Sequence, residues 1–425
     1  MTEAEFATIS SMFTLGGLLG ALAAGPMSSR YGRRPAMRVT ALLYIIGSLV
    51  ETFSPAVWLM SFGRLFSGLA AGASTVIVPL YISEIAPPAE RGLFGVMTQV
   101  SINVGILASQ TLGYFLSHGS AWRYILAAGV CIGAVQALGS LVITESPAWL
   151  ASNGHVAQAK MVLQRIRGKG FDIKAEIETW DEDGEPDEGD RLLGQTDGAP
   201  AEIPATSSKA KHLGFIEVVK DPQYRPAIIA VVGVMCAQQF CGINSIIMYS
   251  VSLLADLLPI SSALLTILIS VVNLITTISC SPLPDRLGRK TCLLISVIGQ
   301  GSSSLVLALS ILFGLKILSA IAVLFFVAFF AVGLGPVPFI LASELVGQEA
   351  VGATQSCALG ANYIATFFVA QFFPIINTAL NNALGGAGWV YFIFAALAAV
   401  SAAFVFWKVP ETKGKKDMDE VWGRG

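Results

Sequence analysis

The chain has 425 residues, of which 54% are hydrophobic and 13% are charged, and its formal net charge at pH 7 is -2. About a quarter of the residues of an average soluble domain are charged, so this composition excludes an ordinary soluble fold. The near balance of 26 basic and 28 acidic residues gives no bulk electrostatic reason to expect nucleic acid as a partner.

The apolar residues are grouped in runs of about 20 or more, the length that an α-helix needs to cross a hydrocarbon core of about 30 Å. The sequence therefore predicts an all-α membrane protein whose surroundings are a lipid bilayer. Eleven spans are predicted, at residues 6–29, 36–53, 58–83, 93–116, 122–143, 226–254, 260–284, 291–313, 317–342, 352–380 and 387–407.

The longest polar interruption, residues 144–225, separates the first five spans from the last six. It begins with apolar residues at helical spacing, such as Val156 and Leu163, which predict short helices. Ten acidic residues follow between Asp172 and Asp190, a composition that is too polar to pack a core. We expect a linker of short helices followed by a flexible acidic stretch.

Basic residues occupy alternate connections between the spans, which predicts the orientation of the chain. They are Arg30, Arg33, Arg34 and Arg38 after the first span, Arg91 after the third, Lys160, Arg165, Arg167 and Lys169 after the fifth, and Arg286, Arg289 and Lys290 after the seventh. These connections, residues 144–225 and the tail at 409–425 are therefore expected in the cytoplasm, with Met1 on the outside.

An internal repeat divides the chain into two related halves. Arg30-Tyr-Gly-Arg-Arg34 recurs as Arg286-Leu-Gly-Arg-Lys290, which predicts an N-terminal bundle at 1–143 and a C-terminal bundle at 226–408. Two spans precede the basic motif in the second half, whereas one precedes it in the first. We therefore expect the first helix of the repeated unit to be missing before Met1.

This repeat of a basic Gly-Arg turn resembles the major facilitator superfamily, and further motifs are similar to those of its sugar porters. These motifs are Gly63-Arg64, Tyr81-Ile-Ser-Glu84 with Arg91-Gly92, Glu145-Ser-Pro147 with Trp149-Leu150, Gln238-Gln239 with Gly242-Ile-Asn244, Gly335-Pro-Val-Pro338 and Pro410-Glu-Thr-Lys-Gly414. The resemblance implies two pseudo-symmetric helical bundles, here of five and six spans, around a central sugar site that opens alternately to each side.

Amide side chains inside the spans are candidate ligands because a buried polar group needs a partner, and because an amide both donates to and accepts from a sugar hydroxyl. Gln99, Asn103 and Gln110 fall within an arc of about 40° on one helix. This polar stripe faces either a cavity or another helix. The structural alternative is hydrogen bonding between helices.

A second group of amides surrounds a glycine in the sixth span. Gln238 and Asn244 differ by about 120° on a straight helix, and Gly242 permits a break that could bring them together. By resemblance, the sugar ligands are Gln99, Gln238, Gln239, Asn244, Asn273, Phe339 and Asn362. At Phe339 the family commonly has Trp, so this chain keeps an aromatic ring but lacks the indole N–H.

Charged residues at the ends of the predicted spans suggest a latch between the two bundles on the cytoplasmic side. The predicted cytoplasmic gate consists of Arg33, Arg34, Glu84, Arg91, Glu145, Arg289, Glu344 and Glu411. The alternative for each arginine is anchoring on the cytoplasmic side. Compared with the family pattern the latch is incomplete, since Val351 replaces an arginine, so we expect a bias toward the inward-facing state.

The resulting hypothesis is a carrier of a hexose or related polyol, working as a facilitator or a proton symporter. The alternatives are a non-transporting sugar sensor and an inactive carrier. No enzyme activity, cofactor or metal site is expected, because the three histidines are scattered and no nucleophile constellation is present. We expect the plasma membrane as its location, with the vacuolar or endosomal membrane as the alternative.

Overall fold

The computed structural model describes residues 3–87, 90–168, 170–174, 176–177, 215–246, 261–347, 349–415 and 418–423. Most of the predicted acidic stretch lies outside the described residues, and so does the sixth predicted span after residue 246. Every regular element of the described residues is a helix, which confirms the predicted all-α class.

Eleven helical segments in the described part are long and apolar enough to cross a membrane, and each coincides with a predicted span. The helices that form them are α1 (Glu3–Tyr31), α2 (Arg33–Phe53), α3 (Val57–Ile85), α4 (Arg91–Leu116), α5 (Trp122–Val142), α11 (Arg225–Phe240), α13 (Ser262–Cys280), α15 (Arg289–Leu312), α16 (Lys316–Val332), α17 (Val337–Glu344), α18 (Val351–Leu384) and α19 (Val390–Lys408). The shorter helices are α6 (Pro147–Ser152), α7 (Val156–Arg167), α10 (Phe215–Lys220), α14 (Leu283–Leu287) and α20 (Met418–Trp422).

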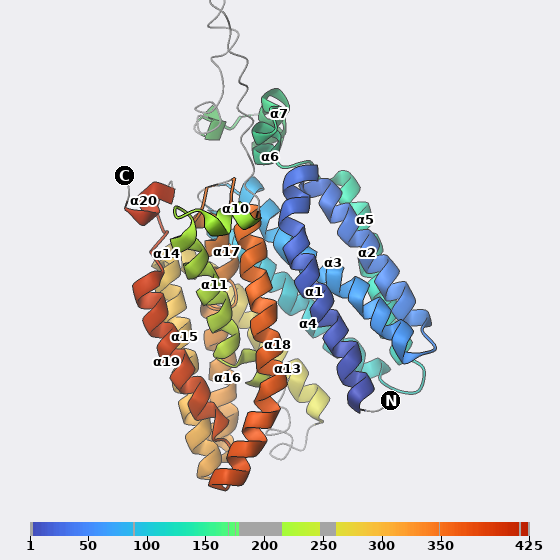
Figure 1. Cartoon of the computed structure of the whole chain (residues 1–425), viewed down its shortest axis with the longest axis vertical. Helices are drawn as coiled ribbons and strands as arrows, with labels where there is room; N and C mark the ends of the chain where they lie inside the picture. The colour runs from blue at the N-terminus through green and yellow to red at the C-terminus, as the bar shows by residue number, and fades with distance from the viewer. Residues whose placement is uncertain are drawn as a thin grey trace, which may run out of the picture.

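The long helices form two groups in space (Figure 1). Helices α1 to α5, blue to teal, make the first bundle, and α11 to α19, green to red, make the second. The two bundles touch through α18 with α1 and α3, through α4 with α13 and α14, and through α17 with α3 and α4. A site shared by the bundles is therefore expected beside these helices.

Small residues allow helices α1 and α3 to pack closely. A Cβ atom added at Gly68 or Gly72 on α3 would collide with the backbone of α1 at Phe13 or Gly17. Because lipid offers no hydrophobic drive for helix association, close backbone contact between small residues is a main source of stability. The first bundle thereby gains a rigid pair of helices that faces α18.

The ninth predicted span is interrupted where the sequence predicted that it could bend. Helix α16 ends at Val332 and α17 begins at Val337, with Gly333, Leu334 and Gly335 between them. Pro336 and Pro338 lack backbone N–H donors, and Gly333 lies directly against the backbone of Cys292 on α15. The interruption leaves the backbone groups of Leu334 available to side chains.

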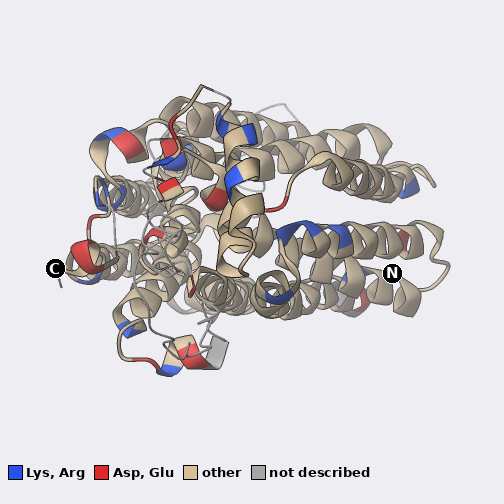
Figure 2. Cartoon of the chain, turned by 90° about the horizontal axis from the view of Figure 1, so that it is seen from above, with Lys and Arg blue, Asp and Glu red and all other residues tan. Residues whose placement is uncertain are grey.

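Charged residues are concentrated at helix ends and connections, and most of the ribbon carries none (Figure 2). Five basic residues, Arg33, Arg34, Arg91, Arg289 and Lys290, begin helices α2, α4 and α15 at the same end of the bundles. We call this the basic end. Helices α6, α7 and α20 lie beside it (Figure 1).

Candidate functional site

The amides of the second bundle form one hydrogen-bonded cluster, which we call the α11 cluster: Gln238, Gln239, Asn244 and Asn362. Gln238 Oε1 accepts from Asn362 Nδ2 at 2.8 Å and from Gln239 Nε2 at 3.3 Å. Asn244 Nδ2 donates to Gln239 Oε1 at 2.6 Å. The predicted break thus brings together side chains that a straight helix would separate.

The backbone of Gly242 makes this arrangement possible. Its φ is +93°, in the left-handed region that favours glycine, and it lies just after the last residue of α11. A Cβ atom at this position would lie 2.7 Å from the ring of Phe394 on α19. The position therefore excludes larger residues for two separate reasons, backbone conformation and space.

We expect Gly242→Ala to destabilise the protein by about 2 kcal/mol or more, since left-handed backbone costs about 1 to 2 kcal/mol for a residue with a Cβ and the methyl group also strikes Phe394. Thermal unfolding of the purified protein in detergent would measure this. Gly385→Ala is the matched control, because Gly385 has φ +72° but open space around it. Equal losses in both variants would exclude a role for Phe394.

A second amide cluster joins the two bundles, and we call it the α4–α13 cluster: Gln99, Asn103, Asn273 and Thr277. Gln99 Nε2 donates to Asn103 Oδ1 at 3.0 Å, and Asn273 Nδ2 approaches the same oxygen at 3.4 Å. Asn103 Nδ2 donates to Thr277 Oγ1 at 2.8 Å. The polar stripe predicted on α4 therefore faces another helix, α13, and that helix belongs to the other bundle.

The interrupted backbone between α16 and α17 contacts both clusters. Gln238 Nε2 donates to the carbonyl oxygen of Leu334 at 2.6 Å. The next residue, Gly335, lies beside Gln99, since a Cβ atom there would be 3.4 Å from Gln99 Cγ, an ordinary van der Waals distance. The α11 and α4–α13 clusters are therefore neighbours across one short piece of backbone, and they combine six of the seven predicted sugar ligands.

Phe339 is the predicted sugar ligand that lies outside both amide clusters. It is buried and lines a small cavity between α3, α4 and α17 on the side of the basic end. The same cavity is lined by Pro79, Ser83, Arg91 and Glu344. Phe339 therefore shares a cavity with two predicted gate residues, and no ring contact or hydrogen bond joins it to either amide cluster in the described part of the chain.

In the described residues, the hydrogen-bonded ion pairs of the predicted gate lie within each bundle, whereas the latch was expected to join the bundles. In the first bundle, Arg33 Nε donates to Glu84 Oε2 at 2.9 Å, and both side chains are 2% exposed. In the second, Arg289 Nη2 lies 2.8 Å from Glu344 Oε1. Each pair ties the start of one helix to the end of the helix beside it.

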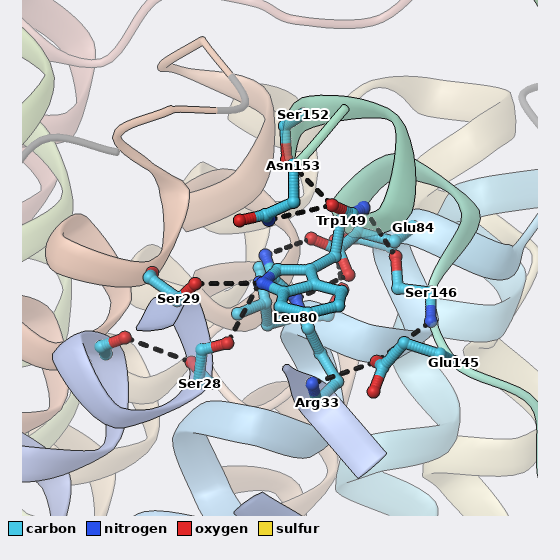
Figure 3. A network of polar contacts seen from close by, with 12 residues as sticks. Ser28, Ser29, Arg33, Leu80, Glu84, Glu145, Ser146, Trp149, Ser152 and Asn153 are labelled. Atoms are coloured by element: carbon cyan, nitrogen blue, oxygen red, sulfur yellow. Dashed lines mark hydrogen bonds and ion pairs between the residues drawn. The ribbon is translucent and has the colours of Figure 1, made fainter. Parts of the chain in front are cut away.

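Two further carboxylates cap the helices that begin with these arginines. Glu145 accepts from the backbone N–H groups of Arg33 at 2.9 Å and Arg34 at 3.1 Å, as drawn in part in Figure 3. Glu411 accepts in the same way from Arg289 at 2.8 Å and from Lys290 at 3.2 Å. A carboxylate at a helix N-terminus satisfies free N–H groups and complements the helix dipole.

The internal repeat in the sequence is therefore also a repeat of side-chain contacts.

Arg34 differs from the expected gate residue, because its guanidinium donates to the carbonyl oxygens of Ser140 and Leu141 and its backbone N–H donates to Glu145. Arg91 also differs, since its buried Nε has no hydrogen-bond partner among the described residues. Of the predicted gate, only Arg91 and Glu344 line the cavity between the bundles.

The basic ends of the two bundles are packed against each other in this structure. The backbone N–H of Gly25 on α1 donates to Ser356 Oγ on α18 at 2.9 Å, and a Cβ atom at Gly25 would lie 2.5 Å from the carbonyl oxygen of Gly352. Gly92 on α4 is in equally close contact with Asp285. The structure therefore does not show the inward-facing arrangement that the incomplete latch was expected to favour.

Gly25→Leu is expected to separate α1 from α18 at the basic end and to shift the protein toward an inward-facing state. A cysteine introduced at Ser83, in the cavity between the bundles, should then react several times faster with a membrane-permeant thiol reagent. Gly113→Leu is the control, because Gly113 has open space around it. Unchanged reactivity in Gly25→Leu would show that this contact does not hold the basic end closed.

Arg64 lies at the opposite end from the gate and has a partner on α2. Its guanidinium is 3.6 Å from Glu51, which is buried and also accepts from Ser67 Oγ at 2.5 Å. The Arg64 guanidinium also lies 5.9 Å from the centre of the Phe13 ring on α1. The arginine therefore links α3 to α1 and α2.

Several groups of the site were not among the predicted ligands. The Leu334 carbonyl oxygen is a backbone group, and only the flanking glycines and prolines signalled that it is free. Thr277 follows Asn273 by one helical turn, so its spacing could have indicated it. Trp149 Nε1 donates to the carbonyl oxygen of Ser29 at 2.8 Å, which joins α6 to the end of α1 (Figure 3).

Comparison with known proteins extends over nearly the whole chain. The family model described as "Sugar (and other) transporter" matches residues 2–422. A probable metabolite transport protein of Saccharomyces cerevisiae is 36% identical, covering 99% of this chain and 83% of the relative. The facilitated glucose transporter member 3 of solute carrier family 2 from Rattus norvegicus is 32% identical, covering 96% of this chain and 80% of the relative.

A solved structure has the same fold. The proton:xylose symporter XylE of the major facilitator superfamily, bound to 6-bromo-6-deoxy-D-glucose, superposes with a TM-score of 0.83 at 25% sequence identity. The superposition covers 100% of this chain and 90% of that chain.

Proposed function

The chain belongs to the sugar transporter family and has the major facilitator fold, and from this premise we propose that it carries a monosaccharide, a hexose or a related polyol, by alternating access. It is a multi-pass membrane protein and not an enzyme. The two bundles, 1–143 and 226–408, are the parts that move relative to each other. Residues 144–225 link them, and residues 409–425 form a tail.

The observation that carries this proposal is the grouping of six predicted ligand amides, from both bundles, in two clusters that meet at Leu334 and Gly335. The amides present donors and acceptors without a buried charge, which suits a neutral ligand rich in hydroxyl groups. Because the α11 cluster belongs to the second bundle and the α4–α13 cluster contains Gln99 and Asn103 of the first, a ligand bound between the clusters interacts with both bundles. Relative motion of the bundles then changes its access to each side of the membrane.

Both modes of transport have a counterpart among the relatives, one described as a facilitated glucose transporter and one as a proton:xylose symporter. We propose transport of the sugar alone or together with protons. The names of these relatives favour a carrier over a sensor. We propose the plasma membrane as its location. We also propose that its basic end faces the cytoplasm, because basic residues are enriched in cytoplasmic loops.

Uptake of radiolabelled monosaccharides by cells that lack their own hexose carriers tests the proposal. We expect saturable uptake of at least one hexose or polyol when the protein is present in the membrane, and inhibition by unlabelled sugars of similar stereochemistry. Uptake equal to that of cells without the protein, across a panel of hexoses, pentoses and polyols, would contradict it.

A further inference from the structure

Asn103 is the point where the two bundles share a hydrogen bond within the candidate site. Its side chain is 2% exposed and lies on α4, one helical turn after Gln99. Its Oδ1 receives one donor from its own bundle, Gln99 Nε2, and one from the other, Asn273 Nδ2. An amide oxygen has two lone pairs, so both are occupied.

Thr277 fixes which way the Asn103 amide points. The Thr277 hydroxyl has a single proton, which it donates to the carbonyl oxygen of Asn273, one turn earlier on the same helix, at 2.7 Å. Its oxygen is then left as an acceptor, and Asn103 Nδ2 donates to it at 2.8 Å. The threonine is fully buried, so water does not compete for this hydroxyl.

This order of donors and acceptors extends to the predicted sugar ligands. Because Asn103 turns its Nδ2 toward Thr277, its Oδ1 must face Gln99 and Asn273. Both of these amides then turn their NH₂ groups toward Asn103. In the described part of the chain, no donor reaches Gln99 Oε1, and that oxygen is left to accept from a ligand.

We propose that Asn103 and Thr277 are positioning residues that hold the Gln99 amide so that its Oε1 faces the ligand as a hydrogen-bond acceptor. This inference rests on the proposed function and makes it more specific, because it states what the substrate must offer on that side. The substrate must present a hydroxyl group that donates its proton. A sugar hydroxyl meets this requirement, whereas a fluorine at the same carbon does not.

The test uses a set of hexose analogues in which one hydroxyl at a time is replaced by hydrogen or by fluorine. At the hydroxyl that faces Gln99, the fluoro analogue should compete for uptake no better than the deoxy analogue, since neither can donate. At a hydroxyl that faces a donor of the protein, the fluoro analogue should compete better than the deoxy analogue. The ratio of the two inhibition constants therefore reports the polarity of each protein contact.

Two variants disrupt the arrangement of donors and acceptors around Asn103 without adding a charge. Asn103→Leu deletes the shared amide, and Thr277→Val deletes the hydroxyl that orients it while keeping the shape of the side chain. In both, Gln99 can turn its NH₂ group toward the ligand, and we expect the fluoro analogue to improve relative to the deoxy analogue by roughly three- to tenfold. The KM for the parent sugar should rise while the maximal rate per protein at the membrane stays similar.

Two controls separate positioning from helix packing. Thr277→Ser keeps the hydroxyl and should retain the wild-type ratio of the analogues. Gln110→Leu removes a third hydrogen bond between α4 and α13, which Ser270 Oγ donates to Gln110 Oε1 at 2.6 Å. This control should weaken the contact of the bundles without changing the ratio.

The outcomes distinguish this inference from the proposed function. Wild-type protein that takes up no monosaccharide would overturn the proposed function itself. Wild-type uptake with an unchanged ratio in Asn103→Leu and Thr277→Val, or with an equal change in Gln110→Leu, would overturn only the positioning role. If Asn103→Leu does not reach the membrane, the Thr277→Val and Thr277→Ser pair decides.

Discussion

Replacing Gln238 by alanine is expected to reduce sugar uptake by about 100-fold or more, with the amount of protein in the membrane nearly unchanged. Gln238 bonds to Asn362, Gln239 and the Leu334 carbonyl oxygen. Its loss leaves these groups without a partner, at about 1 to 3 kcal/mol for each buried polar group. Asn244→Ala should act in the same direction with a smaller effect, because Asn244 has one bond to the cluster.

The measurement is initial-rate uptake, corrected for protein at the membrane. Gln136→Ala is the matched control, since Gln136 is also an amide inside a span but bonds to Thr40 Oγ1 on α2, away from both clusters. An interhelical bond of this kind contributes about 0.6 kcal/mol, so uptake should change little. Wild-type uptake in both Gln238→Ala and Asn244→Ala would exclude the α11 cluster as the sugar site.

Breaking the Arg33–Glu84 pair is expected to have the largest effect on stability. Both side chains are 2% exposed, so Arg33→Met leaves a buried carboxylate without its cationic partner. Loss of one partner of a buried pair costs about 3 to 5 kcal/mol. We therefore expect Arg33→Met, and equally Glu84→Leu, to lower the unfolding temperature in detergent far more than a surface substitution does.

The double variant Arg33→Met with Glu84→Leu should recover much of the lost stability, because no buried charge is left uncompensated. Lys415→Met serves as the surface control, since its contact with Glu420 is 3.9 Å long and both side chains are exposed. Such a pair contributes between about 0 and 1 kcal/mol. A double variant as unstable as the worse single variant would show that Arg33 and Glu84 act independently.

The number of the spans and their approximate positions could be predicted because the bilayer imposes one length and one polarity on every crossing helix. The break at Gly242 was also predictable, from the angle between Gln238 and Asn244 on a straight helix. Both are properties of consecutive residues. Local sequence therefore determined most of the architecture. The recurrence of the motif around Arg33 at Arg289 indicated that the two bundles are structural repeats.

The partners of charged and polar side chains could not be predicted to the same degree, because they depend on which helices become neighbours. Arg33 and Arg289 were expected to join the bundles, yet each pairs with a carboxylate in its own bundle, where the adjacent helix ends. The role of Thr277 depends on its contact with Asn103 across two bundles. The spacing of residues in the sequence predicts neither the partners of the two arginines nor the partner of Thr277.

Counterflow across liposomes tests the central claim most directly, because it requires a binding site that alternates between the two sides of a membrane. Purified protein is reconstituted into vesicles loaded with an unlabelled sugar that it recognises, and labelled sugar is added outside. The account predicts transient accumulation of label in wild-type vesicles and its loss in Gln238→Ala. Sugar binding to wild-type protein without any counterflow would contradict the account and indicate a sensor.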